Sequence, residues 1–208
     1  MGTDKVKRLK NSAEIEFVEK KSVFIAFSTS VENEEQALEI IKQRKKKFAD
    51  ARHNVYAYMI GDGTISRYSD DAEPQGTAGM PVLNAIRMSG LTDVCVVVTR
   101  YFGGILLGAG GLVRAYSTSA SMALEAGGVA VYEDFIEVEC MCSYSNYQKI
   151  QPLLMCFPVI IDDTVFDADV ALKFAIPEEM FDSLEIKINE AFAGKIKLKQ
   201  VGKRQDCR

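Results

Sequence analysis

The sequence predicts an α+β protein of two domains. The segment after residue 134 has the element order strand, helix, strand, strand, helix, strand, which is the order of a ferredoxin-like domain. The chain has 208 residues, whereas single domains cluster at about 100 to 150 residues. Its 48% hydrophobic and 26% charged residues are the composition of a globular protein with ample material for a core. We therefore expect domains at residues 1–134 and 135–208.

Hydrophobic periodicity and turn residues predict the elements of the first domain. They are strands over residues 14–31 with a break at Lys20 and Lys21, 54–60, 64–68 and 93–101, and helices over 34–48, 80–89 and 112–126. Asn33 is a preferred N-cap for the first helix. Asp62-Gly63 is typical of a two-residue hairpin turn, and Gly127-Gly128 closes the last helix.

The second domain is predicted in the same way. It has strands over residues 135–142, 159–176 with a turn near residues 166–168, and 196–201, and helices over 147–156 and 178–192. Its last strand is locally basic. That strand is either an edge for RNA or a charged edge that discourages aggregation.

Charge and composition exclude some classes of function. The net charge of −4 argues against a protein that coats nucleic acid by bulk charge, so any such contact must come from a local patch. The first ten residues have no apolar core, and no run approaches the length that spans a bilayer. Five cysteines at these spacings form neither a disulfide framework nor a zinc site. We expect a cytoplasmic protein without membrane contact.

Two blocks, residues 66–86 and 96–116, each consist of an extended run, a glycine-rich polar loop and a helical segment. The glycines of the second block, Gly103, Gly104, Gly108, Gly110 and Gly111, permit positive φ and the close approach of a backbone or a ligand. A helix that opens near Gly111 presents free N–H groups and the positive end of its dipole. Arg100 and Arg114 add two cations. The block predicts an anion-binding corner suited to phosphate or carboxylate.

A purely structural interpretation stays open. Glycine-rich connections are often only tight packing, and Arg100 can pair with Asp70, Asp71 or Glu73. The spacing completes neither G-x-x-x-x-G-K-[ST] nor G-x-G-x-x-G. The basic run 44–47 either interacts favourably with the negative end of the dipole of the first helix or contacts phosphate.

An enzyme is the alternative to a binding module. His53 is the sole histidine, so it is the candidate base for a serine or cysteine nucleophile, or it is structural. Asp71 is the second catalytic candidate. The acidic loop Asp70, Asp71 and Glu73 either holds a hydrated magnesium ion or caps its own turn and pairs with Arg67 or Arg100. We assign no metal and no cofactor.

Three strings resemble one family. They are HNVYAYMIGDG from His53, YSDDAEPQGTAG from Tyr68 and VVVTRYFGGILLGAGGLVRAY from Val96, and they are similar to the signature of the IMPACT/YigZ family. The resemblance is close over residues 20–127 and looser beyond. Two positions depart from the family pattern: Ala72, where glycine usually follows the paired aspartates, and Gln75, where serine is common.

The resemblance implies both a fold and a role. Members look like two-domain proteins with a first domain of the ribosomal-protein and elongation-factor-G domain-four type, which contains a left-handed βαβ unit. The second domain resembles domain five of that factor. Eukaryotic members act in translational control during amino-acid starvation, by competing for an activator of the general-control kinase.

We therefore expect a protein that binds RNA or a ribosomal component and is linked to translation. The alternatives are a hydrolase or peptidase-like enzyme that uses His53 and the acidic loop, and a protein-interaction module. The residues predicted to bind the anionic partner are Asp70, Asp71, Glu73, Thr77, Arg100, Tyr101, Gly103, Gly104, Gly110, Gly111 and Arg114.

Overall fold

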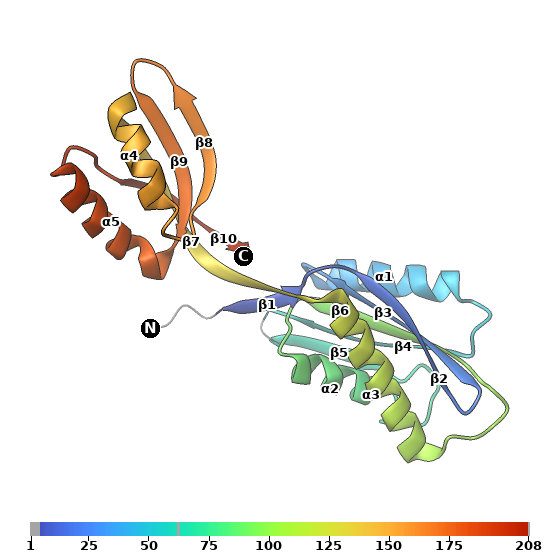
Figure 1. Cartoon of the computed structure of the whole chain (residues 1–208). Coiled ribbons are helices and arrows are strands. Elements are labelled where there is room, and N and C mark those ends of the chain that lie inside the picture. Colours follow the sequence, from blue (N-terminus) through green and yellow to red (C-terminus); the bar gives the residue numbers. More distant parts are fainter. Residues whose placement is uncertain (1–4, 62, 208) are drawn as a thin grey trace. The chain divides into compact units, whose positions relative to one another are not determined.

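The computed structural model describes residues 5–61 and 63–207, and the chain divides into two compact units. The N-terminal unit holds residues 6–131, and the C-terminal unit holds residues from 132 onward together with Lys5. The division lies inside strand β7 (Val129–Cys142), slightly before the boundary expected at residue 134. The chain belongs to the α+β class, as the sequence predicts (Figure 1).

The N-terminal unit contains one strand that was not predicted, at residues 6–9, and otherwise strands and helices close to those predicted. The elements are β1 (Val6–Leu9), β2 (Ala13–Glu19), β3 (Ser22–Ser30), α1 (Glu34–Lys47), β4 (His53–Ile60), β5 (Ile65–Ser69), α2 (Gly79–Ser89), β6 (Val94–Tyr101) and α3 (Gly108–Gly127). Lys20 and Lys21 form the predicted break with positive φ, and the Asn33 side chain caps α1 at the backbone N–H of Gln36. Asp62 of the predicted hairpin turn lies outside the described residues.

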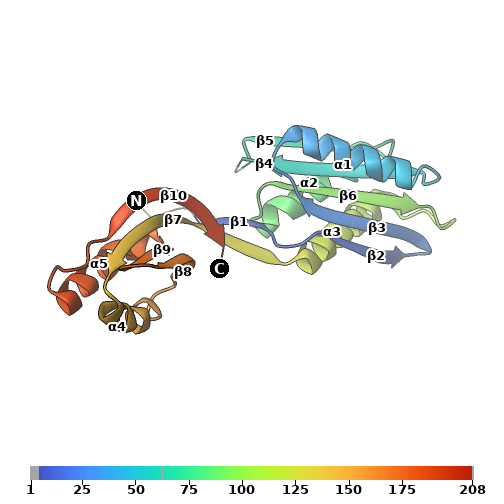
Figure 2. The ribbon, with the colours of Figure 1, turned by 90° about the horizontal axis from the view of Figure 1, so that it is seen from above.

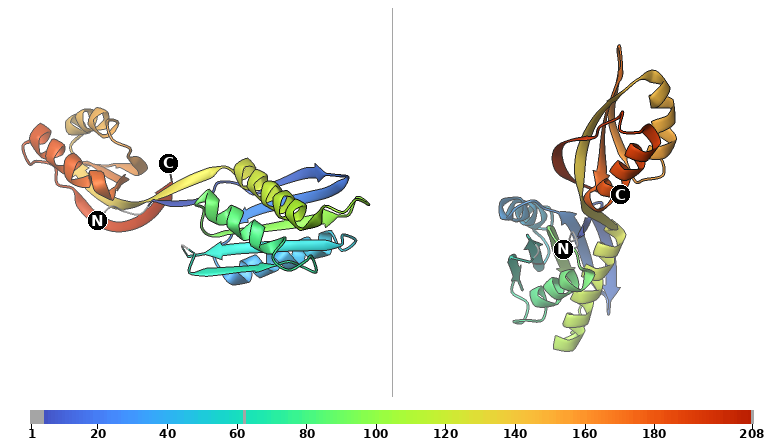
Figure 3. Two further views of the ribbon diagram at one scale, coloured as in Figure 1. Left: turned by 90° about the horizontal axis from the view of Figure 1, so that it is seen from below. Right: turned by 90° about the vertical axis from the view of Figure 1, so that its left-hand side faces the viewer.

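The main sheet of this unit has the strand order β2-β3-β6-β4-β5, and all its pairs are antiparallel. Alternate side chains along the strands face opposite sides of the sheet. Ala37 and Ile41 of α1 pack with Cys95 and Val97 on one side. Helices α2 and α3 cover the other side, as Figures 2 and 3 show from opposite directions. The central β6 is therefore buried on both faces, in agreement with its β-branched run.

The two crossover connections of this sheet have opposite hands. Strands β3 and β4 are parallel because each is antiparallel to β6, and β5 and β6 are parallel because each is antiparallel to β4. The connection through α2 is reversed relative to the one through α1 in three respects: the direction of its strands, its direction of travel across the sheet and the face of the sheet that its helix covers. Each reversal changes the handedness once, so the two connections have opposite hands. In Figure 2 the β3–α1–β4 unit is right-handed, so β5–α2–β6 is the left-handed unit that the resemblance implies, a rare hand for such connections.

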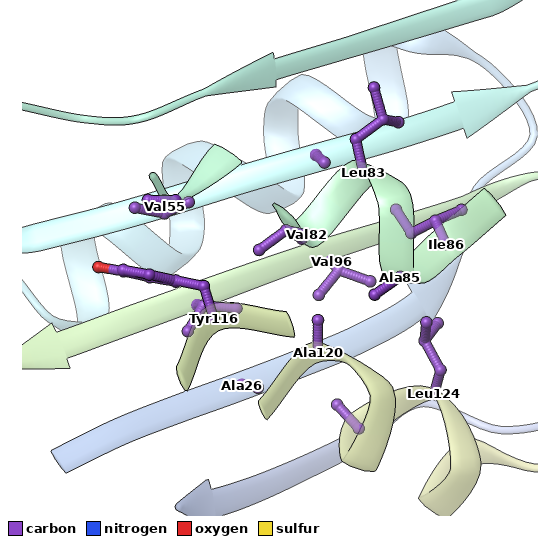
Figure 4. Packing of buried hydrophobic residues seen from close by; sticks show 14 of the residues in the cluster. Ala26, Val55, Val82, Leu83, Ala85, Ile86, Val96, Tyr116, Ala120 and Leu124 are labelled. Carbon is purple, nitrogen blue, oxygen red and sulfur yellow. The ribbon is translucent and has the colours of Figure 1, made fainter. Parts of the chain in front are cut away.

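The core of the N-terminal unit lies between the sheet and the helices α2 and α3. Figure 4 shows small and large side chains alternating across this layer, with Ala26 and Ala120 beside Val96 and Tyr116. The Tyr116 ring meets the edge of Phe24 at a centroid distance of 5.2 Å. Such interdigitation of unequal side chains is how close-packed cores exclude voids.

The C-terminal unit has the predicted ferredoxin-like order. After β7 come α4 (Tyr144–Leu154), β8 (Ile160–Phe166), β9 (Val170–Pro177), α5 (Glu178–Phe192) and β10 (Lys199–Cys207). In the sheet of this unit β7 lies between β10 and β9, and β8 pairs with β9. Cys140 and Cys142 face the core of this unit, and burial raises the pKa of the Cys140 thiol to about 12. That thiol behaves as a small apolar side chain rather than as a nucleophile.

Several predicted element bounds are wrong. Strand β7 begins at Val129 rather than at 135, and helix α4 spans Tyr144–Leu154 rather than 147–156. Helix α3 begins at Gly108 rather than near Gly111, so Gly110 and Gly111 lie inside its first turns. Burial of Leu112, Ala115 and Tyr116 on one helical face outweighs the low helix propensity of glycine. Strand β10 begins at Lys199 rather than at 196, because Ile196 is buried in the core of the unit before the strand starts. In the described part of the chain no helix is long and apolar enough to span a membrane.

The close approach at Gly103 gives a test of the fold. A Cβ built there would lie 2.0 Å from the backbone carbon of Lys21, whereas at Gly104 it would meet nothing within 4 Å. We expect Gly103→Ala to destabilise by about 3 kcal/mol through overpacking against backbone. Gly104→Ala, which only places alanine at positive φ, should cost about 1 kcal/mol. Thermal and urea denaturation measure both, and equal effects would contradict this packing.

Candidate functional site

The two motif loops meet at one end of the N-terminal unit. Strand β4 begins at His53 where β6 reaches Arg100, and these two residues are register partners. The segment from Asp70 to Ala78 and the connection from β6 to α3 flank this point. We call the group of segments the loop end: the β2–β3 turn, the C-terminus of α1, the start of β4, the 70–78 loop and the first turn of α3.

A buried ion pair lies at the centre of the loop end. The Arg100 Nη1 donates to Glu73 Oε1 at 2.6 Å, and the two residues are only 5% and 8% exposed. The Tyr116 hydroxyl donates to the same oxygen at 2.8 Å. Burial, and then the charge of Glu73, raise the pKa of Tyr116, so its hydroxyl stays a donor. Of the alternatives for Arg100, the structure shows pairing with Glu73.

His53 is held by backbone and faces this pair. Its Nδ1 lies 2.8 Å from the Asp71 carbonyl oxygen, which fixes Nδ1 as the protonated nitrogen in the neutral ring. Its Nε2 lies 3.7 Å from Glu73 Oε1, beyond hydrogen-bonding distance. His53 is 7% exposed. The imidazole is thus oriented, with one nitrogen left without a protein partner.

The three loop carboxylates turn to different partners. Asp70 accepts from the N–H groups of Gly76, Ala78 and Gly79, and so caps the start of α2. Asp71 accepts from the Asn54 N–H at 2.6 Å and from Lys45 Nζ at 2.6 Å. Thr77 is buried and donates to the Pro74 carbonyl at 2.6 Å.

These contacts agree with the interpretation of the acidic loop as a cap and an ion pair. Asp70 caps the loop, and Glu73 pairs with Arg100, whereas Arg67 lies nearest to Glu34. Within residues 5–61 and 63–207 no group of three histidine, cysteine or acidic side chains is placed to hold a metal ion. Asp70, Asp71 and Glu73 each bind different protein groups.

The backbone of the loop is strained at a position where the sequence departs from the family pattern. Asp71 and Ala72 have φ of +44° and +66°. The left-handed region costs a residue with a Cβ roughly 1 kcal/mol, and glycine has no such cost. The glycine usual at position 72 in the resembled family would therefore suit this backbone.

The remaining predicted residues lie around the same end. The Tyr101 hydroxyl donates to Asp50 at 2.9 Å, and Arg114 is exposed on the second turn of α3. Gly103 admits the β2–β3 turn, as described above, rather than a ligand. Gly110 and Gly111 belong to the helix, where a Cβ at Gly111 would lie 3.0 Å from the Leu107 Cβ.

A pocket opens beside the ion pair. Its volume is about 460 Å³, and it is lined by Arg52, His53, Ala72, Glu73, Pro74, Arg100, Phe102, Leu106, Leu107, Gly108, Ala109 and Leu112. The floor is charged and one wall is apolar. Sequence reasoning did not single out Arg52, Phe102 or Leu106. Large apolar residues flanked by glycines in a connecting loop were the available signal.

The other two basic segments are structural in part. Arg44 is buried between the rings of Phe27 and Phe48 and pairs with Glu14. In the last strand, Lys203 pairs with Glu178 at 2.5 Å and Arg204 with Asp162 at 2.7 Å. These contacts agree with a charged helix end and a charged strand edge.

Sequence comparison identifies both units. Residues 20–124 match the Impact N-terminal domain, and residues 140–195 match a domain of unknown function, DUF1949. The IMPACT family member YvyE of Bacillus subtilis is 36% identical over 193 residues, which are 92% of this chain and 89% of that protein. The chain belongs to the IMPACT family.

Other members of the IMPACT family extend the comparison. YigZ of Escherichia coli is 34% identical over 183 residues, covering 86% of this chain and 89% of YigZ. Protein IMPACT-B of Xenopus tropicalis is 35% identical over 94 residues, 43% of this chain and 30% of that protein. A solved structure, described as the crystal structure of an hypothetical protein, has a TM-score of 0.61 at 29% identity and covers 97% of this chain and 99% of its own.

The buried pair predicts a large effect of one neutral substitution. Glu73→Gln keeps the shape but leaves the Arg100 charge uncompensated, so it should destabilise by roughly 3 kcal/mol or more. Glu34→Gln is the control, because the Glu34 carboxylate also accepts from a tyrosine hydroxyl but is partly exposed. It should cost about 1 kcal/mol or less. Urea denaturation at neutral pH measures both, and similar midpoints would refute a structural role for the pair.

Proposed function

We propose that this IMPACT-family protein binds RNA, in the ribosome or another part of the translation machinery, through the loop end. The observation that carries the proposal is a set of loop-end cations that have no ion-pair partner among the described residues. The link to translation rests on the resemblance to the family. A ribosomal partner would place the protein in the cytoplasm.

The cations of the loop end are of two kinds. Arg44, Lys45, Lys47 and Arg100 neutralise carboxylates of the protein itself. Five others are exposed and have no ion-pair partner among the described residues: Lys20, Lys21, Lys46, Arg52 and Arg114. A net charge of −4 for the whole chain thus coexists with a local excess of positive charge. Phosphate backbones are bound by such unpaired lysine and arginine side chains.

Exposed apolar side chains occur in the same part of the unit. Phe102 is 42% exposed and Leu106 is 83% exposed, in the connection between β6 and α3. Aromatic and apolar surface beside cations suits single-stranded RNA, because unstacked bases pack on such side chains. The proposed contact residues therefore differ in part from the binding residues that the sequence predicts. Arg100 acts from inside by fixing the loop, while Arg52 and Arg114 face outward.

An enzyme is the second candidate, and one observation favours it. The oriented imidazole of His53, with its Nε2 free beside a pocket, has the geometry of a general base. The lining of the pocket includes no serine, threonine, cysteine or lysine. An attacking group would have to come from water or from the ligand. His53→Ala would abolish any turnover that the purified protein shows.

A salt series tests RNA binding at the loop end. The double variant Arg52→Gln with Arg114→Gln should weaken binding of a single-stranded RNA and lower the slope of log affinity against log salt by about 1.4, at about 0.7 per phosphate contact. The matched control is Lys10→Gln with Arg87→Gln, which removes the same charge near the C-terminal ends of α2 and α3. Fluorescence anisotropy measures both.

The outcomes separate the candidates. An unchanged slope in the loop-end variant, or an equal loss in the control, would contradict RNA binding at this surface. Association with ribosomes that survives nuclease treatment and is unaffected by either variant would point instead to the protein-interaction alternative.

A further inference from the structure

We infer that the pocket of the loop end accepts a phosphate monoester, carried by the terminus of an RNA strand or by a free nucleotide. This inference rests on the proposed function and makes it more specific. It assigns the pocket to a terminal phosphate group, and the outer cations to the phosphodiester backbone. Four features of the pocket support it.

The first feature is the start of α3. The helix has no side-chain cap at Leu107 and no acidic residue in its first turn. Its first N–H groups and the positive end of its dipole are therefore free for an external anion. Gly108 and Ala109 of this turn line the pocket. By contrast, α2 starts with its N–H groups bound by Asp70, so the chain supplies its own anion there.

The second feature is polar atoms without partners next to that turn. His53 is only 7% exposed and lines the pocket, and its Nε2 lies 3.7 Å from Glu73 Oε1, beyond hydrogen-bonding distance. In the neutral ring Nε2 can accept from a P–OH group, which a monoester has when singly ionised, and in the imidazolium it can donate to an ionised oxygen. Arg100, which also lines the pocket, has a buried Nε with no hydrogen-bond partner. A buried polar atom without a partner is unfavourable, and a bound ligand can satisfy it.

The third feature is the charge balance. Glu73 is the one carboxylate among the lining residues, and its Oε1 already accepts from Arg100 and Tyr116. Arg100 offsets its charge, and Arg52 at the exposed rim adds a further positive charge. With the dipole of α3, the pocket favours an anion over a cation.

The fourth feature is size and the apolar wall. A volume of about 460 Å³ lies within the range of about 300 to 1,000 Å³ that small-ligand sites have. Phe102, Leu106 and Leu107 form a wall on which a base or sugar can pack. A monoester carries about −1.5 to −2 charges at neutral pH and three acceptor oxygens. A backbone diester has one charge and continues in both directions, so it suits the open surface.

The experiment compares RNA ends. One pair of single-stranded RNAs is labelled at the 3′ end and carries either a 5′-phosphate or a 5′-hydroxyl. A second pair is labelled at the 5′ end and carries either a 3′-phosphate or a 3′-hydroxyl. Adenosine monophosphate and adenosine serve as competitors. We expect the RNA with a phosphate at one of its ends to bind about tenfold tighter or more than its hydroxyl counterpart, or adenosine monophosphate to bind that much tighter than adenosine. A charge-assisted hydrogen bond has this magnitude.

A variant of α3 tests the place of binding. Ala109→Asp puts a carboxylate in the exposed first turn, where it favours the helix but repels an anion. Ala109→Asn is its neutral match. We expect the ratio of phosphate to hydroxyl affinity to fall to about one in the aspartate variant and to persist in the asparagine variant.

The results distinguish this inference from the proposed function. RNA binding with no preference for a phosphorylated end and no competition by the nucleotide would overturn the inference and leave the proposed function intact. A preference that Ala109→Asp does not change would also overturn it. If the nucleotide binds and RNA does not, the result would support the phosphate pocket and refute the proposed function.

Discussion

The buried pair between Glu73 and Arg100 is the interaction on which the loop end depends. Arg100 belongs to the central strand β6, Glu73 to the 70–78 loop, and Tyr116 of α3 donates to the same carboxylate oxygen. Three segments distant in sequence thus meet at one oxygen. Charges buried this deeply are tolerated only when paired and hydrogen-bonded. Removal of one partner therefore leaves the other charge buried without compensation and destabilises the fold. The pair fixes the loop, and the loop forms the floor of the pocket.

The pair also divides the charges of the loop end by role. The acidic side chains of the loop are used internally: Asp70 caps α2, Asp71 binds the start of β4 and Lys45, and Glu73 neutralises Arg100. For the five exposed cations, the described residues provide no such partner. A protein with a net negative charge can therefore present a positive surface at one end, and the field of such a surface acts at short range under physiological salt.

Sequence reasoning was most successful where hydrophobic periodicity decides the structure. The strand β6, the helix α1 with its Asn33 cap and the ferredoxin-like order after β7 follow from local patterns that tertiary packing reinforces. It failed at the start of α3, because glycine propensity argues against a helix that burial of Leu112 and Tyr116 stabilises. Local patterns cannot indicate such burial.

The candidate site shows the same limit in another form. The sequence brought together the correct loops, and it offered pairing with Glu73 as one explanation of Arg100. It could not show which cations face inward, because that depends on which carboxylates the fold places beside them. Arg52 and Arg114 look no different from Arg100 in the sequence, yet the fold leaves them exposed. The apolar pocket wall at Phe102 and Leu106 could be recognised only once the glycines around it were placed.

An NMR titration of the isotopically labelled protein with a short 5′-phosphorylated RNA tests the central claim most directly. The claim is that the ligand binds at the loop end, on the outer cations and the first turn of α3. It predicts that amide shifts concentrate at residues 52–53 and 102–110, with the far ends of α2 and α3 unaffected. Shifts confined to the C-terminal unit, or spread over both ends of the N-terminal unit, would contradict it.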